Sequence, residues 1–126
     1  MAFENLQSQQ FMNLITYRKS GQTVRTPVWF VQEEACLYVM TGKDAGKIKR
    51  IRNNPTIVVE PSDRTGKSLG PELAAQAHLI TDPAIAAHAT SLLNKKYGFM
   101  KRIFDFMAMF SGGLKNRAYI VITPAE

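Results

Sequence analysis

The first third of the chain places strand-forming segments so close together that no crossover helix fits between them. Residues 11–18 (FMNLITYR) and 23–31 (TVRTPVWFV) are rich in β-branched and aromatic residues, and a polar turn around Gly21 separates them. A second short turn at residues 32–35 leads into residues 36–41 (CLYVMT). Parallel neighbours need a connection of about a dozen residues or more, so these segments are predicted to form three consecutive antiparallel strands.

A proline interrupts the middle strand of this group. Pro27 has no N–H group and therefore cannot donate a ladder hydrogen bond. Its position predicts a bulge, a sheet edge, or a place where the sheet opens for a ligand.

Residues 44–54 (DAGKIKRIRNN) change to helical spacing, because their apolar residues recur three apart. Asp44 is predicted to cap this helix, and Pro55 to end it, because the residue before a proline is disfavoured in the α region. The elements predicted after it are strands at 56–61, 72–80 and 117–122 and a helical stretch at 83–110, broken near Gly98. Residues 72–80 fit a helix or a strand, and we assign a strand because Asp82 and Pro83 directly after them form a helix start.

This order of elements lacks the strict alternation of strand and helix that a doubly wound parallel sheet requires. We therefore predict a mainly β protein with helices (α+β), built as an antiparallel barrel with attached helices. The length of 126 residues is typical of one domain, so residues 1–126 are expected to form a single domain.

Composition excludes several classes of site. Cys36 is the single cysteine and there are two histidines, so neither an internal disulfide nor a Cys/His metal site is expected. No basic residue precedes Arg18, no apolar segment opens the chain, and the longest apolar run, 106–110, is far below the roughly 17–25 residues of a membrane span. We expect a cytoplasmic protein without a membrane partner.

The net charge of +6 indicates an anionic partner. The densest group of charges is Lys43, Lys47, Lys49, Arg50 and Arg52, accompanied by Asp44. Lys43, Lys47 and Arg50 share one face of the predicted short helix. Lys43 and Lys47 lie at its start, where free N–H groups and the helix dipole favour an anion. A phosphate is the natural partner, and a solvated basic face is the alternative.

Other recognition and catalytic patterns are weak. Glycine-containing stretches at 42–47 and 66–68 do not match a phosphate-binding loop of nucleotide triphosphatases. Nucleic-acid binding is not expected, because the aromatic residues fit core positions instead of lining a basic groove. No nucleophile with a base and no carboxylate pair is found, so the catalytic residues are unknown. Trp29 fits either a core position or a contact with a cofactor.

Four stretches together resemble a known family: TYRKSGQTVRTPVWFV, LYVMTGKDAGKIKRIRNNP, LGPEL and LLNKKYG. They resemble the pyridoxamine 5′-phosphate oxidase-like family of FMN-binding split β-barrels. Within that family, the chain is most similar to the branch named for deazaflavin (coenzyme F420)-dependent oxidoreductases. The resemblance extends from about Phe11 to Pro124, and TPVWF followed by GKIKRIRNNP is its most specific part.

The resemblance implies a six-stranded antiparallel split β-barrel that forms a homodimer, with two cofactor sites at the subunit interface. It implies that a strand with Thr26, Pro27, Val28 and Trp29 lies along the cofactor ring. It also implies that the cofactor phosphate is held by Thr41 and by Lys47 with Lys49 or Arg50. The last implication agrees with the independent interpretation of the basic helix as an anion site.

The resemblance further implies an oxidoreductase that transfers a hydride between its cofactor and an unidentified small organic substrate. FMN is the leading cofactor, because the chain uses more Lys than Arg, and coenzyme F420 is the alternative. Arg117 is the only C-terminal candidate for a substrate phosphate, so true pyridoxamine phosphate oxidase activity is not expected. The competing hypothesis is a non-catalytic module that binds or carries a flavin or another planar anion.

Overall fold

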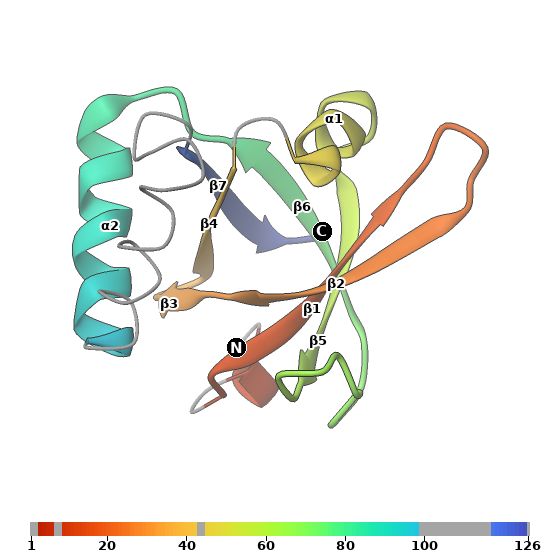
Figure 1. Ribbon diagram of the computed structural model, residues 1–126, viewed down its shortest axis with the longest axis horizontal. Coiled ribbons are helices and arrows are strands. Elements are labelled where there is room, and N and C mark those ends of the chain that lie inside the picture. Colours follow the sequence, from red (N-terminus) through yellow and green to blue (C-terminus); the bar gives the residue numbers. More distant parts are fainter. Residues whose placement is uncertain (1–2, 7–8, 43–44, 99–116, 126) are drawn as a thin grey trace.

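The computed structural model describes residues 3–6, 9–42, 45–98 and 117–125 (Figure 1). The elements in chain order are η1 (a 3₁₀ helix, Glu4–Leu6), β1 (Phe11–Tyr17), β2 (Thr23–Trp29), β3 (Val31–Glu33), β4 (Cys36–Gly42), α1 (Gly46–Asn53), β5 (Thr56–Ser62), β6 (Leu73–Leu79), α2 (Pro83–Tyr97) and β7 (Arg117–Pro124). The protein is mostly β, as predicted, and residues 72–80 contain a strand.

The described strands form one antiparallel sheet in the order β2-β1-β5-β6-β7-β4-β3. Strands β2 and β3 stand at opposite ends of this order, although Phe30 alone separates them in the chain. The sheet therefore curls, because its two end strands are joined through this one residue, and Figure 1 shows β2 running on into β3. Seven strands are described where six were expected. The predicted strand 23–31 is interrupted at Phe30, and it continues as β3, which pairs with β4 instead of β1.

The main core fills the inside of this curled sheet. Along β1, Met12 and Leu14 point inward, in keeping with the two-residue period of a strand. Ile48 and Ile51 of α1 join the same core, as does Leu6 of η1. The apolar stripe predicted for the short helix is thus the side by which α1 is buried on the barrel.

A second core lies on the outer side of the sheet, beneath α2. Ala89, Leu93 and Tyr97 of this helix pack with Val31 of β3 and Tyr38 of β4. Figure 1 shows α2 standing alongside β3, β4 and β7. The sheet is covered on this side because β4 carries apolar residues on both faces.

The start of α2 is confirmed in detail. Asp82 is the N-cap and its Oδ1 accepts a hydrogen bond from the N–H of Ala84 at 2.9 Å, with Pro83 in the first turn. The helix ends at Tyr97, where Gly98 adopts a positive φ of 52°. The second predicted helix, up to residue 110, lies outside the described residues.

The predicted cap of α1 is wrong. The N-cap is Ala45, which has extended backbone angles and no side chain able to accept a hydrogen bond, and the helix begins at Gly46. A backbone bond from Ala45 N–H to Gly42 O, 3.1 Å long, turns the chain from β4 into the helix. Among the helices of the described ranges, none is long and apolar enough to cross a membrane.

Candidate functional site

Helix α1 and two strand ends form a cluster of cationic and hydroxyl groups, which we call the basic rim: Lys47, Arg50, Thr16 and Thr41. Lys47 Nζ donates to Thr41 Oγ1 on β4 at 3.1 Å. Arg50 Nε donates to Thr16 Oγ1 on β1 at 2.6 Å. Both threonines continue the inward-facing rows of their strands, so the barrel itself presents their hydroxyls to the helix.

The burial of Ile48 and Ile51 decides which basic side chains of α1 reach the rim. Lys47 and Arg50 lie on the flank of the buried stripe and are partly buried, whereas Lys49 is exposed. Gly46 matters as well, because a Cβ at this position would lie 2.7 Å from Arg50 Nη1. The missing side chain leaves room for the guanidinium beside the first turn of the helix.

The positive charge of the basic rim is not balanced by the described part of the chain. Burial lowers the pKa of Lys47, and the nearby Arg50 lowers it further. Burial, and then the charge of Arg18, also lower the pKa of Arg50. Neither Lys47 nor Arg50 forms an ion pair with a described carboxylate. Lys47 belongs to the first turn of α1, and the Arg50 guanidinium reaches back to Gly46 at the start of the same helix, which has no side-chain cap. Two cations in this position are a suitable arrangement for binding an anion.

The sheet is open beside this rim. Strand β3 pairs with β4 from Val31↔Tyr38 to Glu33↔Cys36, and the same register would place Val28 opposite Thr41. Within the described residues, no ladder joins β2 to β4, so one side of β2 is a free edge. Pro27 lies in this edge strand, which confirms one of the three interpretations of its position. Strands β2 and β4 come close to each other without pairing, so Thr41, which belongs to the basic rim, also lies on the strand that approaches the free edge of β2.

The structure places the predicted residues of β2 on two faces. Val28 packs into the main core, and Thr26 is two residues away on the same face. Pro27 and Trp29 face outward. The Trp29 ring stacks on the Tyr97 ring at 4.6 Å between centroids with an interplanar angle of 14°. The structure thus brings Thr41, Lys47 and Arg50 together beside the edge that carries Thr26 and Val28, and leaves Lys49 apart.

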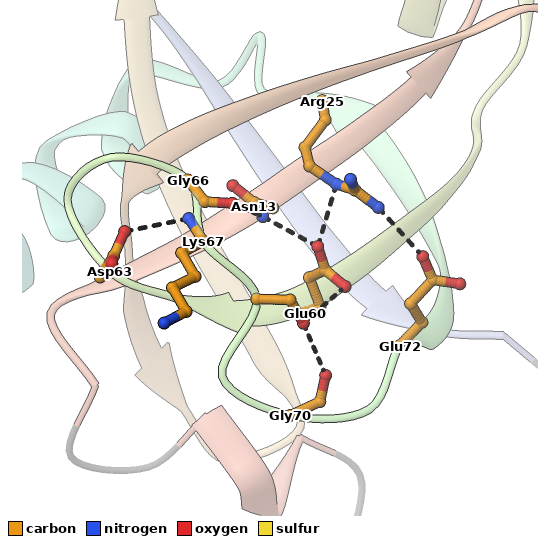
Figure 2. A network of polar contacts seen from close by, with 9 residues as sticks. Asn13, Arg25, Glu60, Asp63, Gly66, Lys67, Gly70 and Glu72 are labelled. Atoms are coloured by element: carbon orange, nitrogen blue, oxygen red, sulfur yellow. Dashed lines mark hydrogen bonds and ion pairs between the residues drawn. The ribbon is translucent and has the colours of Figure 1, made fainter.

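A buried carboxylate, Glu60, binds Arg25 on the outer face of β2, and the sequence analysis did not predict it. Glu60 of β5 is 2% exposed. Its Oε1 accepts from Asn13 Nδ2 at 2.8 Å and pairs with Arg25 Nε at 3.0 Å, and its Oε2 accepts from Ser68 Oγ at 3.2 Å (Figure 2). A charged residue inside the apolar strand TIVVEP was the signal that could have revealed this network.

The loop between β5 and β6 closes over the same network. Asp63 Oδ1 accepts hydrogen bonds from the N–H group of Thr65 and from that of Lys67, and Figure 2 shows the second of these. Asn13 Nδ2 donates to Gly66 O at 2.8 Å. The hydrogen bond from the Thr65 side chain, followed by that from the Lys67 backbone, lowers the pKa of Asp63. This loop is therefore a self-contained turn that helps to bury Glu60.

Metal chemistry receives no support from the described residues, which contain no group of three or more potential metal ligands. No described histidine lies in the basic rim. His88 is exposed and its Nε2 lies 2.7 Å from Glu33 Oε1, on the hairpin tip beside α2. The arrangement of side chains is thus suited to holding an anionic ligand at an open sheet edge.

Comparisons with known proteins agree with the fold of the chain. The haem storage protein HutZ from Vibrio cholerae has a similar fold, with a TM-score of 0.72 and 16% identity over 95% of this chain and 84% of that one. An FAD-binding protein from Mesorhizobium loti gives 0.68 and 19% identity over 97% and 86%. An F420 reductase gives 0.62 and 19% identity over 100% and 95%.

At such low identity these structures support the fold alone. The curated proteins contain no match to the sequence. The sequence model of the family described as pyridoxamine 5′-phosphate oxidase, in contrast, matches residues 2–126. The chain therefore belongs to the pyridoxamine 5′-phosphate oxidase family of flavin-binding split barrels.

Proposed function

We propose that residues 1–126 form one domain that acts as a flavin-dependent or deazaflavin-dependent oxidoreductase. FMN is the leading cofactor and coenzyme F420 the alternative. The reaction is hydride transfer between the bound cofactor and a small organic substrate. One observation carries the proposal. Two cations, Lys47 and Arg50, lie in the basic rim near the free edge of β2, and no described carboxylate balances their charge.

The residues of the site fit an FMN-like cofactor. Lys47 and Arg50 supply two positive charges for a phosphate, and Thr41 adds a hydroxyl. Lys49 is left out, because it is exposed and the structure gives it no contact in the basic rim. The edge of β2 from Thr26 offers main-chain groups that no strand of the described chain pairs on that side.

The cofactor ring, when bound, supplies the hydride chemistry. The protein's part is to hold the phosphate at the basic rim and to orient the ring along the β2 edge. This division of roles explains why the described residues need no acid and base pair at the site. As family resemblance implies, we propose a homodimer whose interface completes the site, since a chain this small encloses little of a flavin.

A second candidate is a module that binds a planar anionic ligand without turnover. Its support is that a solved structure with this fold is a haem storage protein. The basic rim and the β2 edge would serve such a ligand as well, since they provide binding groups and no catalytic pair.

Titration with FMN tests the phosphate contact. Lys47→Met is expected to weaken FMN binding at least about tenfold, because a charge-assisted hydrogen bond to the phosphate is lost. Lys49→Met is the matched control on the same helix, and its affinity is expected to stay within about twofold of wild type. Both affinities follow from the change in flavin fluorescence. Equal effects of the two substitutions would contradict the assigned site.

Turnover separates the two candidate functions. The cofactor is reduced while bound, and candidate acceptors such as quinones are added. An oxidoreductase reoxidises the bound cofactor faster than the same acceptor oxidises free cofactor. A binding module protects the bound cofactor or leaves its rate unchanged.

A further inference from the structure

Phe30 is the residue at which the chain changes its strand partner. Up to Trp29 the chain pairs with β1, and from Val31 it pairs with β4. Phe30 is 0% exposed, so water cannot satisfy its N–H and C=O groups. These two groups need partners from elsewhere in the protein.

Two side chains at the end of α2 provide these partners. The N–H of Phe30 donates to Tyr97 Oη at 2.8 Å, and Lys96 Nζ donates to Phe30 O at 2.9 Å. The same Tyr97 Oη lies 2.8 Å from Phe30 O and 2.7 Å from Gln10 O, so its single proton is donated to one of these carbonyls. Lys96 Nζ also lies 3.7 Å from the centroid of the Phe30 ring.

The Tyr97 hydroxyl takes the place of one hydrogen bond between the two strands. The last pair between β1 and β2 is Phe11↔Trp29, and the next would be Gln10 with Phe30. Instead of a direct bond between these two residues, the hydroxyl lies between the Phe30 N–H and the Gln10 carbonyl. The two strands can therefore separate here without leaving a buried polar group unpaired, and the chain is free to cross to β4.

The Tyr97 ring adds a second constraint through its stacking on Trp29, the last residue of β2. Burial raises the pKa of Tyr97, so the hydroxyl stays protonated at neutral pH and keeps its donor. One side chain of α2 thus holds both the end of β2 and the residue that follows it.

We infer that Tyr97, supported by Lys96, is a positioning residue that determines where β2 leaves β1 and so determines the course of the free edge at Thr26 to Val28. Its effect on the main chain stands on the described contacts. Its effect on the cofactor rests on the proposed function, because it assumes that the ring lies along this edge.

Tyr97→Phe tests the inference, since it keeps the stacking ring and removes the hydroxyl. Tyr119→Phe is the matched control: the Tyr119 hydroxyl also joins α2 to the sheet, by accepting from Thr90 Oγ1 at 2.7 Å, but it does so at β7. Neither variant needs a cofactor for the first measurement, which is hydrogen exchange of the β2 and Phe30 amides. Trp29, the single tryptophan, gives a second readout by fluorescence.

Tyr97→Phe is expected to speed exchange at Phe30 and along β2 by about tenfold and to shift Trp29 emission. Tyr119→Phe is expected to leave these amides within about twofold of wild type. The inference is overturned if the two variants change β2 equally, or if neither changes it.

Affinity measurements test the consequence for the cofactor. Tyr97→Phe is expected to weaken FMN binding about fivefold to tenfold while the affinity for inorganic phosphate stays within about twofold, because the basic rim is untouched. An equal loss for both ligands would contradict a positioning role specific to β2. If wild type binds no FMN, the proposed function fails, and exchange at β2 still decides the role of Tyr97.

Lys96→Met covers the case in which Tyr97→Phe does not fold. It removes the Lys96 contact with Phe30 O, and Lys95→Met, at the neighbouring exposed position of α2, is its control. Lys96→Met is expected to speed exchange along β2 about threefold, and Lys95→Met to leave it unchanged. Identical exchange in these two variants would then reject the inference.

Discussion

Two charged groups lie close to β2, and they differ in how their charge is balanced. Both carboxylate oxygens of Glu60 accept hydrogen bonds, and Arg25 neutralises the charge. Lys47 and Arg50, in contrast, donate to threonine hydroxyls, and the charge of Arg50 lowers the pKa of Lys47, without a described carboxylate nearby to pair with either. The first group is complete in its charge, although the Asn13 Oδ1 atom beside it is buried without a hydrogen-bond partner among the described residues. The second is incomplete without an anion, and this difference is what makes the basic rim the candidate binding site.

The largest expected effect comes from breaking the complete group. Arg25→Met leaves Glu60 buried without a counter-charge, so the free energy of unfolding is expected to fall by about 2–3 kcal/mol, less than for a fully buried pair because Arg25 is half exposed. Urea unfolding measures this loss. Arg64→Met, at an exposed position in the loop after β5, is the control and is expected to change stability by less than about 0.5 kcal/mol. Similar stability of the two variants would show that the burial of Glu60 does not require the charge of Arg25.

The incomplete group is expected to respond in the opposite direction. Without a ligand, Lys47→Met is expected to raise the free energy of unfolding by about 0.5–1 kcal/mol near neutral pH, because it removes a desolvated charge that Arg50 repels. Lys49→Met is the control on the exposed face of α1. A clear loss of stability in Lys47→Met would mean that the charge of Lys47 is already balanced within the protein.

The pH dependence has a definite sign. The folded state holds the Lys47 proton less tightly than the unfolded chain does, because the pKa of Lys47 lies below its ordinary value of 10.5. Between the lowered pKa and 10.5, the unfolded chain binds more protons, so the stability of the ligand-free wild type rises with pH relative to Lys47→Met. The affinity for phosphate falls over the same window, since the cation that binds it is lost. Parallel stability curves for the two proteins would contradict this reasoning.

The smallest effect is expected at Gly46. A methyl group there displaces the Arg50 guanidinium, and Gly46→Ala is therefore expected to weaken phosphate binding about twofold to threefold. Stability is expected to stay the same or rise by a few tenths of a kcal/mol, about what the better helix propensity of alanine contributes near a helix end. Isothermal titration with phosphate and urea unfolding measure the two quantities. A loss of both together would show that the glycine serves the fold and not the anion site.

Local signals in the sequence predicted much of the fold. The hairpin of residues 11–18 and 23–31 followed from composition and a short polar turn, and it is present as β1 and β2. The start of α2 followed from Asp82 and Pro83, since a cap acts on N–H groups only two or three residues away. The cap at Asp44 was predicted wrongly, because the chain enters α1 through a backbone turn after β4 that the local pattern does not specify.

The candidate site was predicted in part. Its placement at the start of the basic helix came from charge spacing, and the choice between Lys49 and Arg50 stayed open. The structure favours Arg50, because the direction in which α1 is buried decides which flank reaches Thr16. Thr16 and Gly46 were missed, because their part in the site comes from their closeness to the Arg50 guanidinium, which the sequence alone does not reveal.

By itself, the sequence determined the antiparallel arrangement of the early strands and the membership of the chain in its family, and its net charge predicts an anionic partner. These properties depend on short connections, on total charge and on motif spacing, all of which are local or additive. The tertiary structure alone decided that the chain changes its strand partner at Phe30 and that Tyr97 and Lys96 supply the hydrogen bonds for this change. It also decided that, within the described residues, Glu60 has a counter-charge while Lys47 and Arg50 have none. These features depend on contacts between residues that are far apart in the sequence. A buried polar group is stable only where such contacts supply its hydrogen bonds.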